Sequence, residues 1–324
     1  MLASGAAAPP VPETRCAIED PRLAELSGLV VHDGLWAMGD GGRSIQVHRL
    51  DPGTCAVVDT RSADIDPYDA EDLAVGPDGA LWVSDTGDND RDRDTVAVIV
   101  LPERGEARLH RLTYPDGPHD AEALLVDAEG RPVVITKEVG GPAGVYRTAE
   151  PPEGSGPTPL ERVGAVALPA SESVGGPVGG LGSRVVTGAA ASADGSVLAL
   201  RSYTDAWLYP VADGELVAAL DGAPVQVPLA DEPQGEAIAF EPDGTLLSGS
   251  ETRGGVPGAI RAVPGAAALA TDDTTPTAAP PAAAEPYDPA PEWLPAAIAG
   301  GVAAGVLLLL TAAMALRGAL RRRR

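Results

Sequence analysis

The sequence is poor in aromatic residues, lysine and asparagine. Only 3% of its 324 residues are aromatic, with a single Phe, and Lys137 and Asn89 are the only residues of their kinds. By contrast, the chain contains 39 Gly and 32 Pro. A helical bundle needs long helices with few such breakers, so this composition predicts a fold with many turns.

Basic residues are scarce as well. The formal net charge is −24, and Arg317 and residues 321–324, all arginine, lie beyond the last acidic residue, Glu292. The part of the chain before them is therefore more acidic still. Such a body repels a phosphate backbone, which argues against nucleic acid as a partner. Cations, or basic and polar ligands, suit it better.

Signatures of common catalytic sites are also missing. The sequence has no GxSxG elbow, no Gly-rich phosphate loop and no Cys or His spacing typical of a metal site. Among four histidines, His119 in "PHDAEA" lies nearest the site expected below. It could serve as an acid or base, or it could be a loop residue that is held by hydrogen bonds.

Five segments share one plan, in which a strand-like run, a DG or EG turn and a second strand-like run follow one another. These segments begin at Ser27, Glu71, Glu122, Thr187 and Glu236. Their turn glycines, spaced 45, 51, 65 and 49 residues apart, are Gly34, Gly79, Gly130, Gly195 and Gly244. Glycine readily adopts the positive φ of a tight hairpin. Repeats of about 40 to 50 residues are typical of propeller blades.

Further strand-like runs follow each hairpin, such as "IQVHRLD" and "CAVVDTR" in the first unit, so each unit predicts four strands. The last unit has only "AIRAVP" after its hairpin, whereas "TRCAI" precedes the first hairpin without a partner. We therefore predict an all-β propeller over residues 14–264, closed by the N-terminal strand. Five blades match the repeats, a sixth could lie within residues 160–186, and an open β-sandwich is the alternative.

Several strings within these repeats resemble a known family. They include "DAEDLAVGPDGALWVSDTGDN", "YPDGPHDAEALLV" and "PQGEAIAFEPDG". They are similar to secreted or membrane-attached propellers of high-GC Gram-positive bacteria, whose biochemical function is not settled. More distantly, the chain resembles calcium-dependent propeller hydrolases, including phytase-like and gluconolactonase-like proteins. That second resemblance implies a fold more than an activity.

The two ends of the chain predict an anchored protein. Residues 1–13 are expected to be a signal-peptide remnant or a disordered leader, and residues 265–293 form a Pro, Ala and Thr-rich stalk. Residues 294–316 carry no charge and are long enough for a transmembrane helix. The Arg-rich tail at 317–324 then lies in the cytoplasm and the propeller outside the cell. A tail-anchored protein that faces the cytoplasm is the alternative.

Two rings of side chains are expected at one mouth of the propeller channel, where inner strands begin and their hairpin partners end. The first ring comprises Ser27, Glu71, Glu122, Thr187 and Glu236. The second ring comprises Asp40, Asp85, Lys137, Arg201 and Glu251. These residues are the predicted ligand-binding site. Asp85 opens an acidic loop that imitates an EF-hand, but Arg93 stands where the EF-hand turn needs glycine.

Converging carboxylates need a compensating cation. Hard carboxylate oxygens suit Ca²⁺, which predicts a metal site formed by Glu71, Asp85, Glu122 and Glu236. Alternatively, Lys137 and Arg201 could pair with the carboxylates in a network without metal. The sequence leaves both open.

Two functions therefore remain. The first is a cell-surface module that binds a small-molecule ligand or a partner protein, and the second is a Ca²⁺-dependent hydrolase of an ester, lactone or phosphoester. No residue is assigned as catalytic. Cys16 lies in the closing strand and Cys55 begins the outer strand of the first unit, which suggests a disulfide, although two buried free thiols would also suit the pattern.

Overall fold

The computed structural model describes residues 11–271 as an all-β unit, which confirms the predicted fold class. Twenty strands form three four-stranded sheets and one eight-stranded sheet. The helices in this part of the chain are short: η1 (Pro21–Leu23), η2 (Gly179–Arg184), α1 (Leu216–Ala219) and α2 (Ala266–Thr271). No helix among residues 11–271 is long and apolar enough to cross a membrane. The leader at 1–10, most of the stalk, the span at 294–316 and the tail at 317–324 lie outside the described residues.

The strands fall into five antiparallel runs of four. The first three runs comprise β2 (Leu26–Val31), β3 (Leu35–Gly39), β4 (Ile45–Leu50), β5 (Val57–Ala63); β6 (Asp72–Val75), β7 (Leu81–Asp85), β8 (Val96–Leu101), β9 (Arg108–Thr113); and β10 (Ala121–Val126), β11 (Pro132–Thr136), β12 (Ala143–Thr148), β13 (Thr158–Val166). A short parallel pairing of β9 with β13 joins the second and third runs into the eight-stranded sheet.

The remaining two runs include the N-terminal strand. They comprise β14 (Val186–Ala191), β15 (Val197–Ser202), β16 (Asp205–Pro210), β17 (Val225–Pro228); and β18 (Gly235–Phe240), β19 (Leu246–Ser250), β20 (Ala259–Val263) with β1 (Glu13–Ala17). Because β1 pairs with β20, the start of the described chain completes the run that holds its end. Residues 167–185, where a sixth unit could have lain, form a loop and η2.

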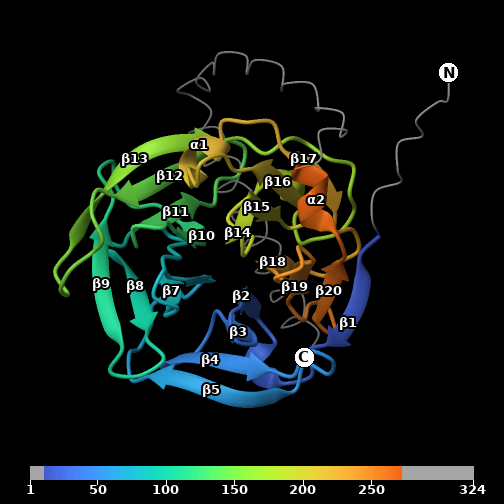
Figure 1. Ribbon diagram of the computed structural model, residues 1–324, viewed down its shortest axis with the longest axis horizontal. Coiled ribbons are helices and arrows are strands. Elements are labelled where there is room, and N and C mark those ends of the chain that lie inside the picture. Colours follow the sequence, from blue (N-terminus) through green and yellow to red (C-terminus); the bar gives the residue numbers. More distant parts are fainter. Residues whose placement is uncertain (1–10, 272–324) are drawn as a thin grey trace, which may run out of the picture. The chain divides into compact units, whose positions relative to one another are not determined.

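The runs are arranged around a common centre, as Figure 1 shows, in a propeller-like ring. Their first strands neighbour one another in the cyclic order β2, β6, β10, β14, β18 and back to β2. Five buried apolar clusters fill the spaces between neighbouring runs, and one of them joins the fifth run to the first. Each run is therefore covered on both faces, which explains why its second strand is buried along nearly its whole length.

Glycine turns within the runs and one disulfide between two runs stabilise the ring. All five turn glycines predicted above have positive φ, from 70° at Gly195 to 133° at Gly34. Cys16 of β1 and Cys55, just before β5, form a disulfide with a Cα–Cα distance of 5.8 Å. This bond links the outer strands of the fifth and first runs, where the two ends of the ring meet.

Two sides of the ring follow from this topology. On the front face, first strands begin, second strands connect to third strands, and each run connects to the next. On the turn face lie the five hairpin turns and the connections between third and fourth strands.

Candidate functional site

β-Bulges direct a recurrent set of side chains toward the centre of the front face. In four runs the pairing of the first and second strands skips one residue near the start of the first strand. The skipped residues are Ser27, Glu122, Thr187 and Glu236, all members of the first predicted ring. Glu71 precedes β6 in the remaining run and donates its backbone N–H to Ser84 at 2.8 Å. A β-bulge turns a side chain away from the regular alternation of a strand. Because the bulge recurs at the same position in four runs, the side chains of these residues form a ring.

The two hydroxyl members of this ring bind backbone rather than one another. Ser27 donates to the carbonyl oxygen of Glu71, and Thr187 donates to that of Gly235 at 3.0 Å. Each bond connects one first strand to the start of the next. The three glutamates are thus the members whose charged groups remain at the centre.

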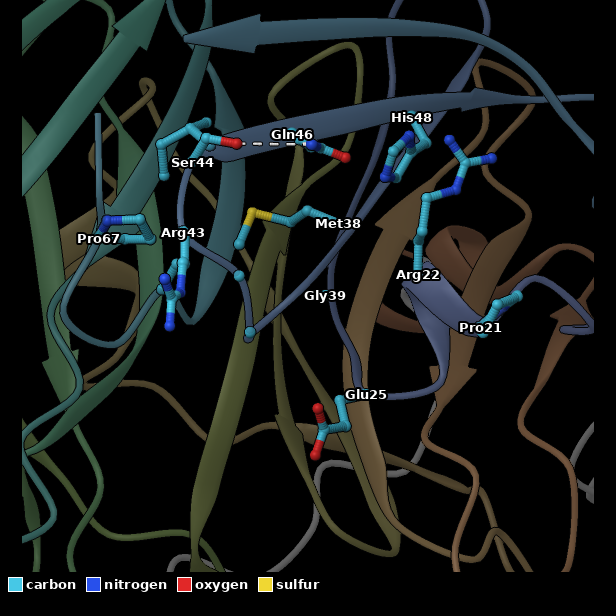
Figure 2. Close-up of a pocket in the computed structure, with 14 residues that line it drawn as sticks. Pro21, Arg22, Glu25, Met38, Gly39, Arg43, Ser44, Gln46, His48 and Pro67 are labelled. Atoms are coloured by element: carbon cyan, nitrogen blue, oxygen red, sulfur yellow. Dashed lines mark hydrogen bonds between the residues drawn. The ribbon is translucent and has the colours of Figure 1, made fainter. Parts of the chain in front are cut away.

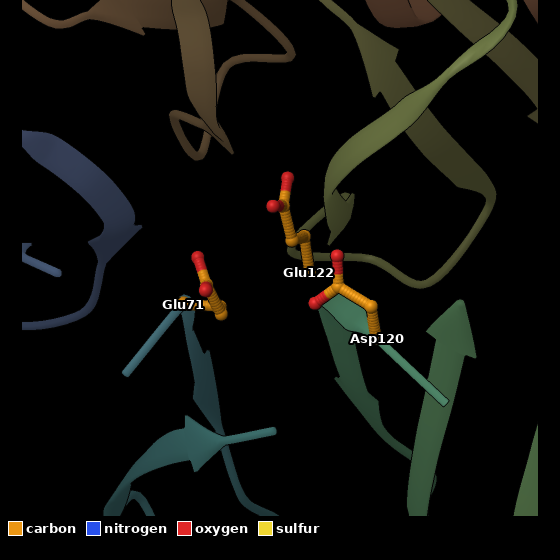
Figure 3. A group of neighbouring side chains, drawn as sticks. All are labelled: Glu71, Asp120 and Glu122. Carbon is orange, nitrogen blue, oxygen red and sulfur yellow. The ribbon is translucent and has the colours of Figure 1, made fainter. Parts of the chain in front are cut away.

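Three carboxylates converge between the second and third runs. Glu71, Asp120 and Glu122 each offer an oxygen within 4.8 Å of the others, and their side chains project toward a common region (Figure 3). All three are buried, with exposed fractions of 7%, 6% and 4%. Asp69 lies beside them, since a Cβ atom added to Gly87 would collide with the carboxylates of both Glu71 and Asp69. We call Asp69, Glu71, Asp120, Glu122 and Glu236 the acidic centre.

One ammonium group compensates part of this charge. Lys137 forms an ion pair with Oε1 of Glu122. The other oxygen of Glu122, Oε2, is buried without a hydrogen-bond partner among the described residues, and so is Oε2 of Glu236. A buried carboxylate oxygen without a partner is costly. These two atoms mark where the site lacks a cation or a donor.

Burial and mutual repulsion raise the pKa values of four carboxyl groups of the acidic centre. Burial raises the pKa of Glu122 to about 8, although Lys137 opposes the shift. Burial, together with the charge of Glu122, raises the pKa values of Glu71 and Glu236 well above the ordinary range. For Asp69, burial and the charge of Asp120 act in the same direction. Protons and metal ions therefore compete for these oxygens.

The second predicted ring divides into two depths. The backbone N–H groups of Asp40, Lys137 and Glu251 bond the carbonyl two residues before the bulge of their own run, at 3.1, 2.8 and 2.8 Å. These three therefore occupy equivalent positions. Burial and neighbouring carboxylates raise the pKa of Asp40 to about 6 and that of Glu251 to about 7.

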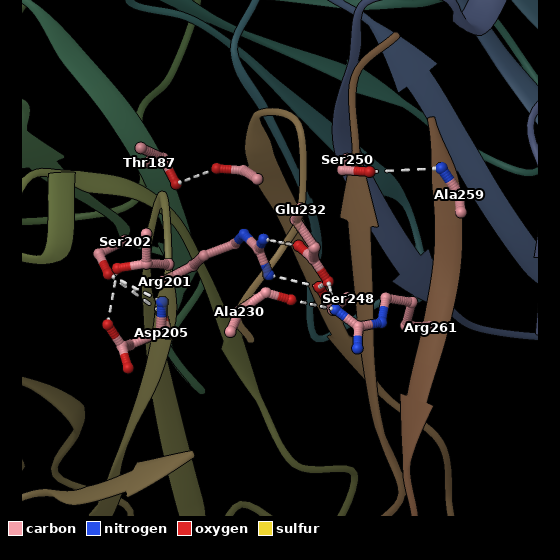
Figure 4. Close-up of polar contacts among 12 residues, drawn as sticks. Thr187, Arg201, Ser202, Asp205, Ala230, Glu232, Ser248, Ser250, Ala259 and Arg261 are labelled. Carbon is pink, nitrogen blue, oxygen red and sulfur yellow. Dashed lines mark hydrogen bonds and ion pairs between the residues drawn. The ribbon is translucent and has the colours of Figure 1, made fainter. Parts of the chain in front are cut away.

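Arg201 lies deeper than these three residues. It pairs in register with Gly188, as Ile135 does with Ala123, which places Tyr203 rather than Arg201 at the level of Lys137. The guanidinium is fully buried, forms an ion pair with Glu232 and donates to Ser248 Oγ at 2.5 Å (Figure 4). Arg201 thus neutralises Glu232, which the sequence analysis did not single out, and not a carboxylate of the acidic centre.

Asp85 is engaged by two neighbouring loops, the β5–β6 connection and the loop that follows β7. Its Oδ1 accepts the backbone N–H groups of Tyr68 and Asp69 at 3.1 and 2.9 Å and lies 3.2 Å from the guanidinium of Arg93. The cluster of converging carboxylates therefore contains Asp120 where the sequence predicted Asp85. Asp88, next in the acidic loop, caps the N–H groups of Asp92 and Arg93, both at 3.0 Å.

His119 belongs to a separate polar group. Its Nε2 lies 3.0 Å from Asp116 Oδ1 and 2.9 Å from the hydroxyl of Tyr146. The ring also packs edge-on against Tyr114 at 5.0 Å between centroids. These contacts match the interpretation of His119 as a loop residue held by hydrogen bonds.

Sequence reasoning missed a central carboxylate, Asp72. It is fully buried, and its side chain accepts the N–H groups of Leu73, Leu124 and Ala189 at 2.8, 2.9 and 3.2 Å. Burial nevertheless raises its pKa. Asp72 links the first strands of three runs, and only its place next to Glu71 in "AEDLAV" could have drawn attention to it.

Two hollows lie away from the acidic centre. One, of about 290 Å³, is on the front face of the first run, where Arg43 faces Arg22 and His48 across Met38 (Figure 2). The other, of about 310 Å³, is at the turn-face end of the central strands and is lined mainly by apolar residues such as Leu73, Leu124 and Phe240. Neither contains a member of the acidic centre.

The sequence matches no protein-family model and no curated protein. Among solved structures, the chain is similar to a gluconolactonase from Xanthomonas campestris, with 17% identity, a TM-score of 0.43 and coverage of 79% of this chain and 89% of that one. A PQQ-bound aldose sugar dehydrogenase from Streptomyces coelicolor shares 12% identity, with a TM-score of 0.41 and coverage of 79% and 99%. Likeness at this level carries no argument about the activity of this chain.

Proposed function

We propose that this protein is a binding module whose acidic centre holds a divalent cation, with Ca²⁺ the ion that its ligands suit best. In this proposal each run of strands is one blade of a five-bladed propeller. The uncharged residues 294–316 anchor it, with the propeller outside the cell and the arginine tail in the cytoplasm. The resemblance to secreted and membrane-attached propellers points to the same location.

One observation carries the proposal. Glu122 has one oxygen paired with Lys137, while its Oε2 is buried without a partner beside the converging carboxylates of Glu71 and Asp120. A single ammonium cannot neutralise these three groups together with Asp69 and Glu236. A divalent cation would supply the missing charge and bond the free oxygen.

The ligand atoms favour Ca²⁺ over softer metals. All candidate donors are carboxylate oxygens, and Ca²⁺ takes six to eight oxygen ligands in flexible geometry. Glu71, Asp120 and Glu122 would hold the ion, and Gly87 leaves space for the carboxylates of Glu71 and Asp69. The ion would bring positive charge to the centre and could bind an oxygen of the ligand there.

The hydrolase alternative has less support. A hydrolase needs a base near the reacting atoms. Lys137 is paired with Glu122, and His119 bonds Asp116 and Tyr146 instead of the acidic centre. We therefore place binding before catalysis.

Calorimetry and thermal melting of the purified full chain, with Ca²⁺ and with EDTA, test the proposal. We expect Ca²⁺ to raise the melting temperature, because an ion at a hundredfold excess over its Kd stabilises the folded state by about 2.7 kcal/mol. Glu122→Gln should remove most of this response.

Glu103→Gln is the matched control, since Glu103 is an exposed residue of the turn face. It should respond to Ca²⁺ like the wild type. Melting curves of wild type that are identical in Ca²⁺ and EDTA would refute the cation site.

A further inference from the structure

Large exposed apolar side chains are concentrated on the front face. Among the described residues, eight such side chains are exposed, and Val11 and Val58 are the two that lie elsewhere. The other six, which we call the apolar rim, are Tyr68, Val139, Val174, Val178, Leu181 and Val256. Five of the six lie in loops that follow a second strand or connect two runs, and Leu181 lies in η2, which is part of such a connection. Loops alone do not explain this, because the loops of the turn face carry none among these eight.

Contacts between loops make much of the rim continuous. Arg93 lies over the ring of Tyr68 at 4.9 Å, and Arg91 of the same loop pairs with Glu138, next to Val139, at 2.8 Å. Lys137 in turn lies 5.7 Å from the ring of Tyr203. Gly176 and Gly182, which flank Val178, pack against that same tyrosine. The apolar side chains therefore border the acidic centre from several sides.

The loop that carries three rim residues is held in place. Ser171 and Ser173 donate to the buried carboxylate of Asp205 at 2.5 and 2.7 Å. The carbonyl of Val174 accepts the N–H of Asp231 at 2.9 Å. An exposed apolar side chain on an anchored loop is available for contact without a large ordering cost.

Acidic side chains lie among the rim residues. Glu172 and Asp231 are both exposed beside Val174. Glu172 precedes Val174 by two residues, and the backbone N–H of Asp231 donates to the carbonyl of Val174. Asp90 and Asp92 are exposed in the loop that contacts Tyr68 and Glu138. A surface of this kind is complementary to an apolar patch with lysine or arginine around it.

We propose that the apolar rim is the docking surface for a protein partner that presents apolar side chains beside lysine or arginine. This inference rests on the proposed binding function of the front face, but not on the metal. A lipid bilayer is the other apolar surface that an exposed apolar rim could contact. The acidic residues around the rim oppose it, because anionic headgroups repel them and attract basic segments instead.

Peptide display provides a test with a defined probe. The purified full chain is used to select phage that display random short peptides, and selected peptides are then measured against variants by calorimetry. We expect the peptides to carry lysine or arginine next to apolar residues. Replacing three rim residues, Val174→Ser, Val178→Ser and Leu181→Ser, should weaken their binding by about tenfold or more. Asp231→Asn should weaken it less and reduce its salt dependence.

Val58→Ser, an exposed valine of β5 outside the rim, is the matched control and should bind like the wild type. Since all these side chains are exposed, melting curves should not change. Peptides without basic residues, equal binding by the rim variant, or preferential binding to phosphatidylglycerol vesicles would each overturn the proposal. If Ca²⁺ does not bind but the rim dependence holds, only the proposed cation site fails.

Discussion

The front face and the turn face are built from the same repeat, yet they differ in chemistry. The front face gathers buried carboxylates and exposed apolar side chains on loops of unequal length. The turn face repeats one short hairpin five times, each with a glycine of positive φ. The hairpin must keep its turn geometry to set the register of two strands, whereas the front loops are free to vary. Function is therefore expected where the repeat is least regular.

If the ring of strands and the front-face site have separate roles, a change to the ring should lower stability without weakening Ca²⁺ binding. The disulfide Cys16–Cys55 closes a loop with a sequence separation of 39 residues and lies on the outer strands. Replacing both cysteines by alanine should lower the free energy of unfolding by about 4 kcal/mol, mainly because the unfolded chain gains freedom. Denaturant titration measures this loss. Calorimetry at low temperature should find unchanged Ca²⁺ affinity, and a parallel loss of affinity would contradict the separation.

The next largest effect is expected at Lys137. Above pH 8, where Glu122 is ionised, Lys137→Met leaves this carboxylate in the acidic centre without its ion pair, which should cost about 3 kcal/mol in EDTA. Burial lowers the pKa of Lys137, but Glu122 outweighs it and keeps the ammonium charged. Calcium should restore much of the loss and bind the variant more tightly, since the ammonium no longer competes for Glu122.

Arg184→Met serves as its control, because Arg184 is an exposed cation of the front face. Denaturant titrations in EDTA and in Ca²⁺ should show little change for this variant. A Lys137→Met protein as stable as wild type in EDTA would mean that Glu122 is neutral and that the ion pair contributes nothing.

The fold was largely predictable because the repeat is visible in the sequence. The DG and EG turns fix five hairpins, and the unpaired "TRCAI" predicts the closing strand, which β1 and its pairing with β20 provide. The short parallel pairing between β9 and β13 was not predictable, since it depends on how two outer strands converge in space. Sequence periodicity contains no information about that contact.

The candidate site was predictable in its first ring and in three members of its second ring, Asp40, Lys137 and Glu251. Glu71, Glu122 and Glu236 share a position relative to their turn glycines, so counting residues finds them. Counting fails for part of the second ring, because the register differs between hairpins. Arg201 pairs with Gly188 and Ser84 pairs with Asp72, so Arg201 and Asp85 fall short of the level that Lys137 occupies. Asp120 and Asp69 precede the repeat's strands, and their approach to Glu122 and Glu71 depends on bulges and on Gly87.

The pH dependence of stability should distinguish the two faces further. In the folded state Asp40, Glu251 and Glu122 have pKa values raised to about 6, 7 and 8, chiefly by burial. The folded protein therefore keeps protons that the unfolded chain has released. Without metal, the free energy of unfolding should fall as pH rises from about 4.5 to 8, at up to about 1.4 kcal/mol per pH unit for each such proton.

Calcium replaces these protons, so its affinity should rise over the same pH range and its presence should flatten the decline. Denaturant titrations at several pH values, with and without Ca²⁺, provide the measurement. Glu122→Gln should remove the part of the slope nearest pH 8. A metal-free stability that increases with pH throughout this range would be inconsistent with buried, proton-binding carboxylates.

The smallest expected effects come from two glycines, one on each face, replaced by alanine. Gly195 has φ of +70° with open space around it, so Gly195→Ala should cost about 1 kcal/mol of stability and leave Ca²⁺ binding intact. Gly87 is not among the glycines of positive φ, but a Cβ there would displace Glu71 and Asp69. Gly87→Ala should therefore weaken Ca²⁺ binding about 10- to 100-fold, the range seen when groups that orient metal ligands are disturbed. The chemical change is the same in both variants. Melting curves therefore report the cost of the backbone conformation at Gly195, and calorimetry reports the effect on Ca²⁺ affinity of filling the space at Gly87. Equal Ca²⁺ affinities would show that the space beside Glu71 does not serve a cation.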